Sequence, residues 1–158
     1  MRIVGLWLLA VVTTSAQAEE GTRFNGFHVN MTRQEVIASK PAKYALTTSS
    51  QDKYLVFRDP RFTDFDKRGT PCAEFIMEGD TIEKMRLLKC FFGAEDLPSE
   101  DFIKVVLKSY GLNASCKSKT TIAGSEPHCV GTTGKGEVFE VDTGQVSVTR
   151  MRQKPNFN

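Results

Sequence analysis

The sequence has little histidine and no excess of charge of either sign. Of its 158 residues, 21 are Lys or Arg and 19 are Asp or Glu, which leaves a formal charge of +2 at pH 7. Such a balance gives no strong field toward nucleic acid or an anionic surface. The two histidines, His28 and His128, fall in expected strands, and neither a partner nucleophile nor a Gly-x-Ser-x-Gly elbow is identifiable. We therefore expect a non-enzymatic protein without a cofactor.

Metal and nucleotide sites also lack their usual spacing. The four cysteines include no close pair of the kind that tetrahedral zinc sites use, and His128 beside Cys129 does not supply one. The aspartates between residues 59 and 66 do not have EF-hand spacing, and basic side chains stand among them. The Gly-rich segment 131–136 has Gly136 where a phosphate loop needs Ser or Thr. We expect no bound metal.

Long apolar runs are missing except near the N-terminus, where residues 3–12 follow Arg2. That run is too short to cross a bilayer, which needs about 20 residues. With Ala16-Gln17-Ala18 behind it, the segment has the pattern of a signal peptide, residues 1–18, cleaved after Ala18. No cysteine stands at the cleavage site to carry a lipid anchor. We expect a periplasmic or secreted protein with neither a membrane span nor a lipid anchor.

No linker rich in Pro, Gly or Ser divides residues 19–158, which we expect to form a single compact domain. Four cysteines in an exported chain favour two disulfides over free thiols. Three pairings are possible, and we favour Cys72 with Cys90 and Cys116 with Cys129 because each pair closes a local loop. Each loop would contribute about 3 kcal/mol in the chain-entropy model.

Residues 70–92 have the pattern of a β-hairpin. A short apolar run at 73–77 is followed by turn residues at 78–81, with Gly79 free to adopt positive φ, and by an extended run at 82–92. Folding back at this turn brings Cys72 close to Cys90. The hairpin would then be closed by a disulfide near its open end.

The remaining chain repeats one order of elements. A helix is predicted from the capping box Thr32 to Glu35 until Pro41, and a second from the acidic segment at 96–101 until Gly111. About four short strands follow each helix. The prediction is an α+β fold of two tandem units, about 24–92 and 93–158, each with one helix packed on an antiparallel meander sheet and stapled by a disulfide.

Residues 30–36, Asn-Met-Thr-Arg-Gln-Glu-Val, resemble the start of a helix in two kinds of small exported protein. One is the β-lactamase-inhibitor-protein (BLIP-like) family, and the other is the small lipoprotein of the outer-membrane assembly machine. The sequence departs from their pattern at Asn30, where they have Gly, and it lacks the lipoprotein cysteine. The resemblance implies tandem helix-plus-sheet repeats, a bacterial envelope and a role in protein binding.

The segment 59–71 is the most suggestive loop because it combines aromatic rings with charges of both signs, as protein contacts do. Its candidate contact residues are Asp59, Arg61, Phe62, Asp64, Phe65 and Arg68. The alternative is that both Phe rings tuck into the core and the charges are solvated.

These features predict a non-enzymatic protein-binding module, of inhibitor or immunity type, whose partner is another envelope or secreted protein. Two alternatives remain open from the sequence. One is an envelope enzyme that cleaves glycan with carboxylates scattered along the chain. The other is a component of envelope assembly.

Overall fold

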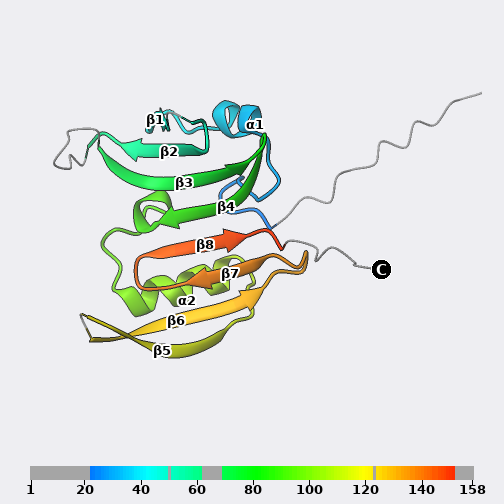
Figure 1. Ribbon diagram of the computed structural model, residues 1–158. Helices are drawn as coiled ribbons and strands as arrows, with labels where there is room; N and C mark the ends of the chain where they lie inside the picture. Colours follow the sequence, from blue (N-terminus) through cyan, green and yellow to red (C-terminus); the bar gives the residue numbers. More distant parts are fainter. Residues whose placement is uncertain (1–21, 50, 62–68, 123, 152–158) are drawn as a thin grey trace, which may run out of the picture.

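The computed structural model describes residues 22–49, 51–61, 69–122 and 124–151, so the predicted signal peptide lies outside the described residues. Eight strands form one antiparallel sheet in the order β1-β2-β3-β4-β8-β7-β6-β5 (Figure 1). The strands are β1 Ala45–Thr48, β2 Tyr54–Asp59, β3 Thr70–Glu78, β4 Thr81–Leu88, β5 Ser115–Thr121, β6 Gly124–Thr132, β7 Val138–Val141 and β8 Gln145–Thr149. The helices are α1 Arg33–Ala38, the 3-10 helix η1 Lys89–Phe91 and α2 Ser99–Ser109.

The predicted fold of two tandem units, each with its own sheet and helix, is wrong. β4 pairs with β8 from Lys84↔Thr149 to Leu88↔Gln145, and this pairing joins all eight strands into one sheet. The helices are also unequal, since α1 has six residues, fewer than two turns, and α2 has 11. A continuous sheet is favoured physically because two separate sheets would leave the edges of β4 and β8 unpaired.

β3 and β4 form the predicted hairpin. The turn between them contains Gly79 at φ +61°, a left-handed conformation that glycine adopts without steric cost. The second strand is shorter than predicted, because the chain leaves the sheet after Leu88 and turns into η1. There the Lys89 N–H donates to the Gly144 carbonyl oxygen at 3.0 Å, which fixes η1 to the turn before β8.

The capping box predicted for α1 is present. The Glu35 N–H donates to Thr32 Oγ1 at 3.3 Å, and the Thr32 N–H donates to Glu35 Oε2 at 2.7 Å. The helix ends at Ala38, before Pro41 is reached. Such a short helix is held by its cap and by Val36, its buried residue, since one and a half turns have little intrinsic stability.

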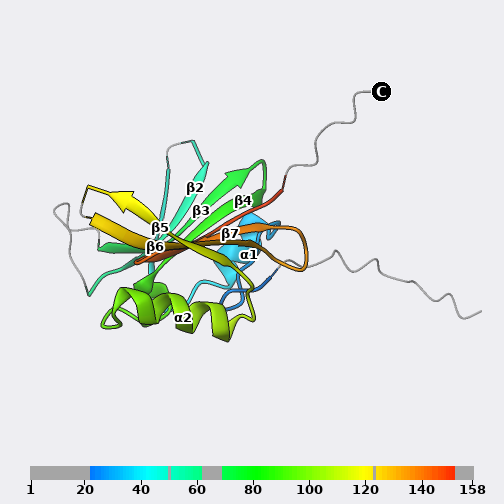
Figure 2. The ribbon, with the colours of Figure 1, turned by 90° about the horizontal axis from the view of Figure 1, so that it is seen from below.

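α2 lies against one face of the sheet (Figure 2) and buries Phe102, Ile103 and Val106 there. Eight side chains, one from each strand, lie in a cross-strand line on this side; we call them the core row. They are Leu46, Phe57, Ala73, Leu87, Val146, Val141, Cys129 and Cys116. Aromatic rings complete the core, among them Phe27 against Phe75 with centroids 5.3 Å apart. Full burial of each such ring stabilises the fold by about 2 to 3 kcal/mol.

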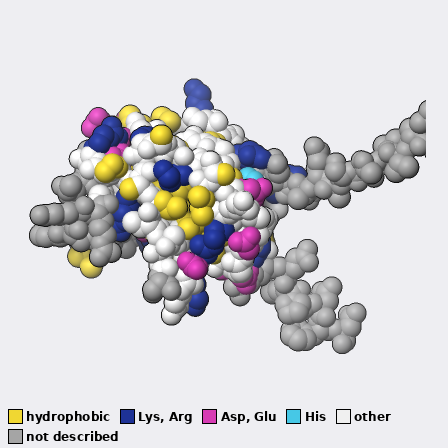
Figure 3. Space-filling view, turned by 90° about the horizontal axis from the view of Figure 1, so that it is seen from above, with side chains coloured by type: hydrophobic (Ala, Val, Ile, Leu, Met, Phe, Trp, Pro, Cys, Tyr) yellow, Lys and Arg dark blue, Asp and Glu magenta, His cyan; other side chains and the backbone are white. Residues whose placement is uncertain are grey.

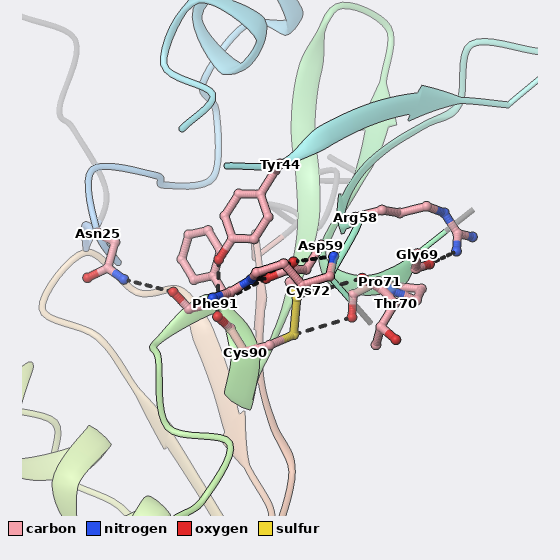
Figure 4. Close-up of a disulfide and its surroundings, with 11 residues drawn as sticks. Asn25, Tyr44, Arg58, Asp59, Gly69, Thr70, Pro71, Cys72, Cys90 and Phe91 are labelled. Atoms are coloured by element: carbon pink, nitrogen blue, oxygen red, sulfur yellow. Dashed lines mark hydrogen bonds and ion pairs between the residues drawn. A yellow bond between two sulfur atoms is a disulfide. The ribbon is translucent and has the colours of Figure 1, made fainter. Parts of the chain in front are cut away.

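Two disulfides reinforce the sheet, one toward each end of the strand order. Cys72, at the start of β3, bonds to Cys90 in η1, and Cys116 on edge strand β5 bonds to Cys129 on β6. Cys116 and Cys129 are direct cross-strand partners with Cα atoms 4.0 Å apart. The Cys72–Cys90 bond holds η1 against β3 (Figure 4).

Candidate protein-binding face

The side of the sheet that faces away from α2 carries a second cross-strand line of side chains, which we call the outer row. Because side chains alternate between the faces of a strand, each member of the outer row is the sequence neighbour of a core-row residue. The outer row consists of Thr47, Val56, Glu74, Arg86, Ser147, Glu140, Val130 and Ser115. The outer row therefore runs across the full width of the sheet, one side chain from each strand. We call the whole of this side the open sheet face.

Apolar side chains lie within the open sheet face, between polar ones. Val130 is 38% exposed, and Tyr54, which pairs with half-buried Ile76, is 44% exposed. Val56 and Val138 are half-buried on the same side. Protein contacts likewise mix apolar and charged side chains. Here the apolar side chains lie toward β2 and toward β6 and β7, on either side of the centre of the face.

An ion pair stands in the middle of the outer row. Arg86 Nη1 lies 2.8 Å from Glu74 Oε2, across the β3–β4 pairing, and the two side chains are 41% and 29% exposed. Arg86 Nε is buried and donates no hydrogen bond within the described part of the chain. In water such a half-exposed pair is worth about 0.2 to 1 kcal/mol. Its stronger effect would come on binding, when a partner excludes water from it.

A second charged group lies toward β6. His128 Nε2 is 4.0 Å from Glu140 Oε2, so protonation of the imidazole would create an ion pair on the open sheet face. Lys117 is the direct cross-strand partner of His128 on β5. This part of the face therefore carries two basic side chains beside one carboxylate.

The edge of the molecule near β1 presents a similar mixture. Seen from above, hydrophobic side chains gather at the centre of this view with basic and acidic side chains around them (Figure 3). Among the exposed large apolar residues is Ile37 of α1, at 44%. No single sign of charge dominates the surface in this view.

The loop predicted to make contacts is described only at its ends. Phe62, Asp64, Phe65 and Arg68 lie outside the described residues. Asp59 is fully buried, and Arg61, whose side chain is 63% exposed, donates to it from the guanidinium at 2.6 Å and from the backbone at 2.9 Å.

The contact between these two residues sets their ionisation. Hydrogen bonds from the Arg61 side chain hold the pKa of the Asp59 carboxyl below its usual value, and the same bonds raise the pKa of Arg61. The far end of the loop is held as well, because Arg58 Nη1 donates to the Gly69 carbonyl oxygen at 2.7 Å. Asp59 therefore fixes the base of the loop, with its carboxylate directed inward.

Within the four described segments, no group of three or more His, Cys, Asp and Glu side chains is arranged to hold a metal ion. Nor does any described helix have the length and apolar character needed to cross a membrane.

The two histidines have different neighbours. His28 Nδ1 lies 2.7 Å from the Val29 carbonyl oxygen, whereas His128 Nε2 lies near the Glu140 carboxylate.

Sequence reasoning missed the outer row. The alternation of apolar and polar residues in β2, β3 and β8 is visible in the sequence and indicates which side chains share a face within one strand. The line itself depends on the pairing of β4 with β8, two strands that are far apart in the chain. No local pattern specifies that pairing. The sequence therefore indicates which side chains share a face within each strand, but not that the strands combine into one open sheet face.

Residues 30–36, which carry the resemblance to exported helix-plus-sheet proteins, lead into α1 and supply its capping box. Because a capping box occurs at many helix starts, this local agreement leaves the resemblance a prediction. Comparison with protein-family models, with curated proteins and with solved structures gave no match.

Proposed function

We propose that this chain is an exported, non-enzymatic binding module that recognises another protein with its open sheet face. Both cysteine pairs form disulfides, which indicates an oxidising compartment of the extracellular type. The signal-peptide pattern of residues 1–18 supports the finer assignment to the periplasm or to secretion. The partner would then be an envelope or secreted protein.

The observation that carries the proposal is the outer row. Seven strand spacings of about 4.8 Å give the open sheet face a width of about 34 Å, and strands of six residues give it a length of about 20 Å. The resulting area, on the order of 700 Å², approaches the roughly 800 Å² that each partner contributes to a standard protein interface. The described helices leave a face of this size uncovered (Figure 2), which gives room for a specific partner.

The chemistry of the face supports a protein partner. Val130 and Tyr54 offer exposed apolar surface, and the Glu74–Arg86 pair offers charge in a fixed orientation. Desolvated apolar contacts supply affinity, and oriented charges select one partner over others. An inhibitor or immunity-type protein needs both properties, and we infer that class of function for this chain.

Site-specific crosslinking tests the proposal in the cell that makes the protein. A photoreactive phenylalanine analogue is placed at Val130 on the open sheet face or at Val105 on α2, two valines of similar exposure at 38% and 47%. We expect a discrete protein adduct from position 130 and none from position 105. An adduct that forms equally from both positions, or only from position 105, would remove the open sheet face as the binding surface.

A further inference from the structure

A cavity of about 370 Å³ lies at the end of the sheet where β4 leaves it and β8 begins. The described residues that line it are Thr70, Leu88, Lys89, Cys90, Glu95 and Gly144. Leu88 follows Arg86 by two positions on β4, so it belongs to the side of the sheet that carries the outer row. Lys89 reaches toward α2, so the cavity lies at the end of the sheet, between the open sheet face and the α2 side.

The cavity has apolar walls. Leu88 and Cys90 contribute apolar surface, and Gly144 contributes no side chain. Lys89 also lines the cavity, but its ammonium group is engaged elsewhere: it donates to the Leu97 carbonyl oxygen at 2.7 Å and lies 5.7 Å from the centre of the Phe102 ring. An occupant would thus meet the aliphatic stem of Lys89 rather than a free charge.

The rim of the cavity is acidic. Glu95 lines it, and Asp96 follows directly in the chain; both are exposed. No hydrogen bond or ion pair joins either carboxylate to another described residue, and Arg61, whose guanidinium is bonded to Asp59, also interacts electrostatically with Glu95. The rim thus carries two carboxylates without a direct bond to another described residue, and Arg61 and Lys89 offset part of their charge.

The walls are held in place before any partner arrives. The disulfide fixes Cys90, the Tyr44 hydroxyl donates to the Cys90 carbonyl oxygen at 3.1 Å, and Asn25 Nδ2 donates to the Phe91 carbonyl oxygen at 3.4 Å (Figure 4). Gly144 is fixed as well, because its N–H donates to Asp142 Oδ1 at 3.0 Å and its carbonyl oxygen accepts from the Lys89 N–H at 3.0 Å. A preformed pocket loses little conformational entropy when it is filled.

We propose that this cavity receives an apolar side chain of the partner protein, carried next to a lysine or arginine that pairs with Glu95. The proposal rests on the proposed function, because it assigns an anchor point at the end of the same face. The volume is at the lower end of the range for ligand pockets, roughly 300 to 1,000 Å³, and suits one aromatic side chain. The Glu95 carboxylate at the rim selects a basic neighbour over an acidic one.

A dipeptide probe tests the assignment without knowledge of the partner. N-acetyl-Phe-Lys-amide is titrated into the full chain labelled with 15N, and amide shifts are followed by NMR. We expect saturable shifts at Leu88, Lys89, Cys90 and Gly144, with a dissociation constant on the order of 1 mM. N-acetyl-Phe-Glu-amide and N-acetyl-Ala-Lys-amide should each bind at least fivefold more weakly.

Gly144→Leu is the blocking variant and Gly134→Leu is its matched control. Both glycines lie in turns of the same half of the sheet, and an added Cβ at either would meet no atom within 4 Å, so both variants should fold. Gly144→Leu should abolish the shifts, and Gly134→Leu should leave them unchanged. Glu95→Gln should weaken N-acetyl-Phe-Lys-amide toward the affinity of the Ala-Lys and Phe-Glu probes.

Three results would overturn the proposal: no saturable shifts at the cavity, equal binding by Gly144→Leu and Gly134→Leu, or concentration-dependent shifts of the same amides without peptide. The last result would assign the cavity to a second copy of the chain. Failure here is distinguishable from failure of the proposed function, because crosslinking at position 130 does not depend on the cavity. If crosslinked adducts at position 130 persist in Gly144→Leu and no dipeptide binds, the open sheet face would still be the binding surface. Only the proposal that the cavity receives a side chain of the partner would be wrong.

Discussion

Reversal of the ion pair at the centre of the outer row separates its part in folding from its part in binding. In Arg86→Glu, the 2.8 Å contact with Glu74 is lost and two carboxylates stand directly opposite each other on β3 and β4. In the double variant Glu74→Arg with Arg86→Glu, the pair is restored with its direction inverted. Opposite charges again face each other within the sheet, but a partner now encounters a positive charge on β3 and a negative charge on β4.

The stability change can be worked from the geometry. Loss of a half-exposed pair costs about 0.5 kcal/mol, and two like charges about 4 Å apart repel by about 1 kcal/mol when well solvated. Arg86→Glu should therefore lose about 1.5 kcal/mol of unfolding free energy, which lowers Tm by about 3 to 6 °C for a chain of this size. The double variant should recover about 1 kcal/mol of that loss.

Urea denaturation of the four proteins of this double-mutant cycle measures the coupling directly. The two side chains are in contact across paired strands, so a coupling energy near zero would refute the register of the β3–β4 hairpin on this face. With the partner identified by crosslinking, the double variant should bind at least tenfold more weakly although its stability is largely restored. Wild-type affinity in the double variant would show that the pair is not part of the interface.

Three further predictions concern stability. Replacement of Cys116 and Cys129 by Ala removes a disulfide whose cysteines are separated by 13 in the sequence. The free energy of unfolding should fall by about 3 kcal/mol, and calorimetry should show a Tm lower by about 6 to 12 °C. An unchanged Tm would mean that this disulfide does not constrain the unfolded chain. Asp59→Asn should be less stable than the wild type at neutral pH, because the fold lowers the pKa of the Asp59 carboxyl and so favours its charged form. The stabilising effect of the carboxylate is complete above the ordinary carboxyl pKa of about 4. It disappears as the pH falls through the lower pKa of the folded state. Chemical denaturation between pH 2 and pH 7 checks the sign, and a difference that grows on acidification would contradict it. Thr32→Ala removes the α1 cap and should cost about 1 kcal/mol in urea denaturation, with Thr32→Ser as the control that keeps it.

Local features of the fold could be predicted from the sequence because local chemistry specifies them. Thr32 and Glu35 mark the start of α1 through their reciprocal hydrogen bonds, and Gly79 marks the β3–β4 turn through its positive φ. The disulfides followed the same logic, since each joins cysteines that one turn of chain brings together. Each of these predictions needed only residues within one short segment.

The features that failed depend on contacts far apart in the chain. The single sheet depends on the pairing of β4 with β8, from Lys84↔Thr149 to Leu88↔Gln145. No residue pattern in either strand specifies the other as its partner. The end of β4 at Leu88 depends likewise on the bond from Lys89 to Gly144, beyond the reach of the local apolar run. The burial of Asp59 could not be read from a charged loop sequence, because it depends on how the loop base packs.

The central claim is that the open sheet face binds the partner, and affinity at two matched valines tests it most directly. Val130→Arg places a long side chain on the face beside Glu140, and Val105→Arg places the same side chain on α2 at similar exposure. Affinity for the crosslinked partner is measured by calorimetry for both variants after thermal unfolding has shown that both are folded. We expect Val130→Arg to lose at least tenfold in affinity and Val105→Arg to change by less than twofold. Equal loss in both variants, or loss in Val105→Arg alone, would contradict the account.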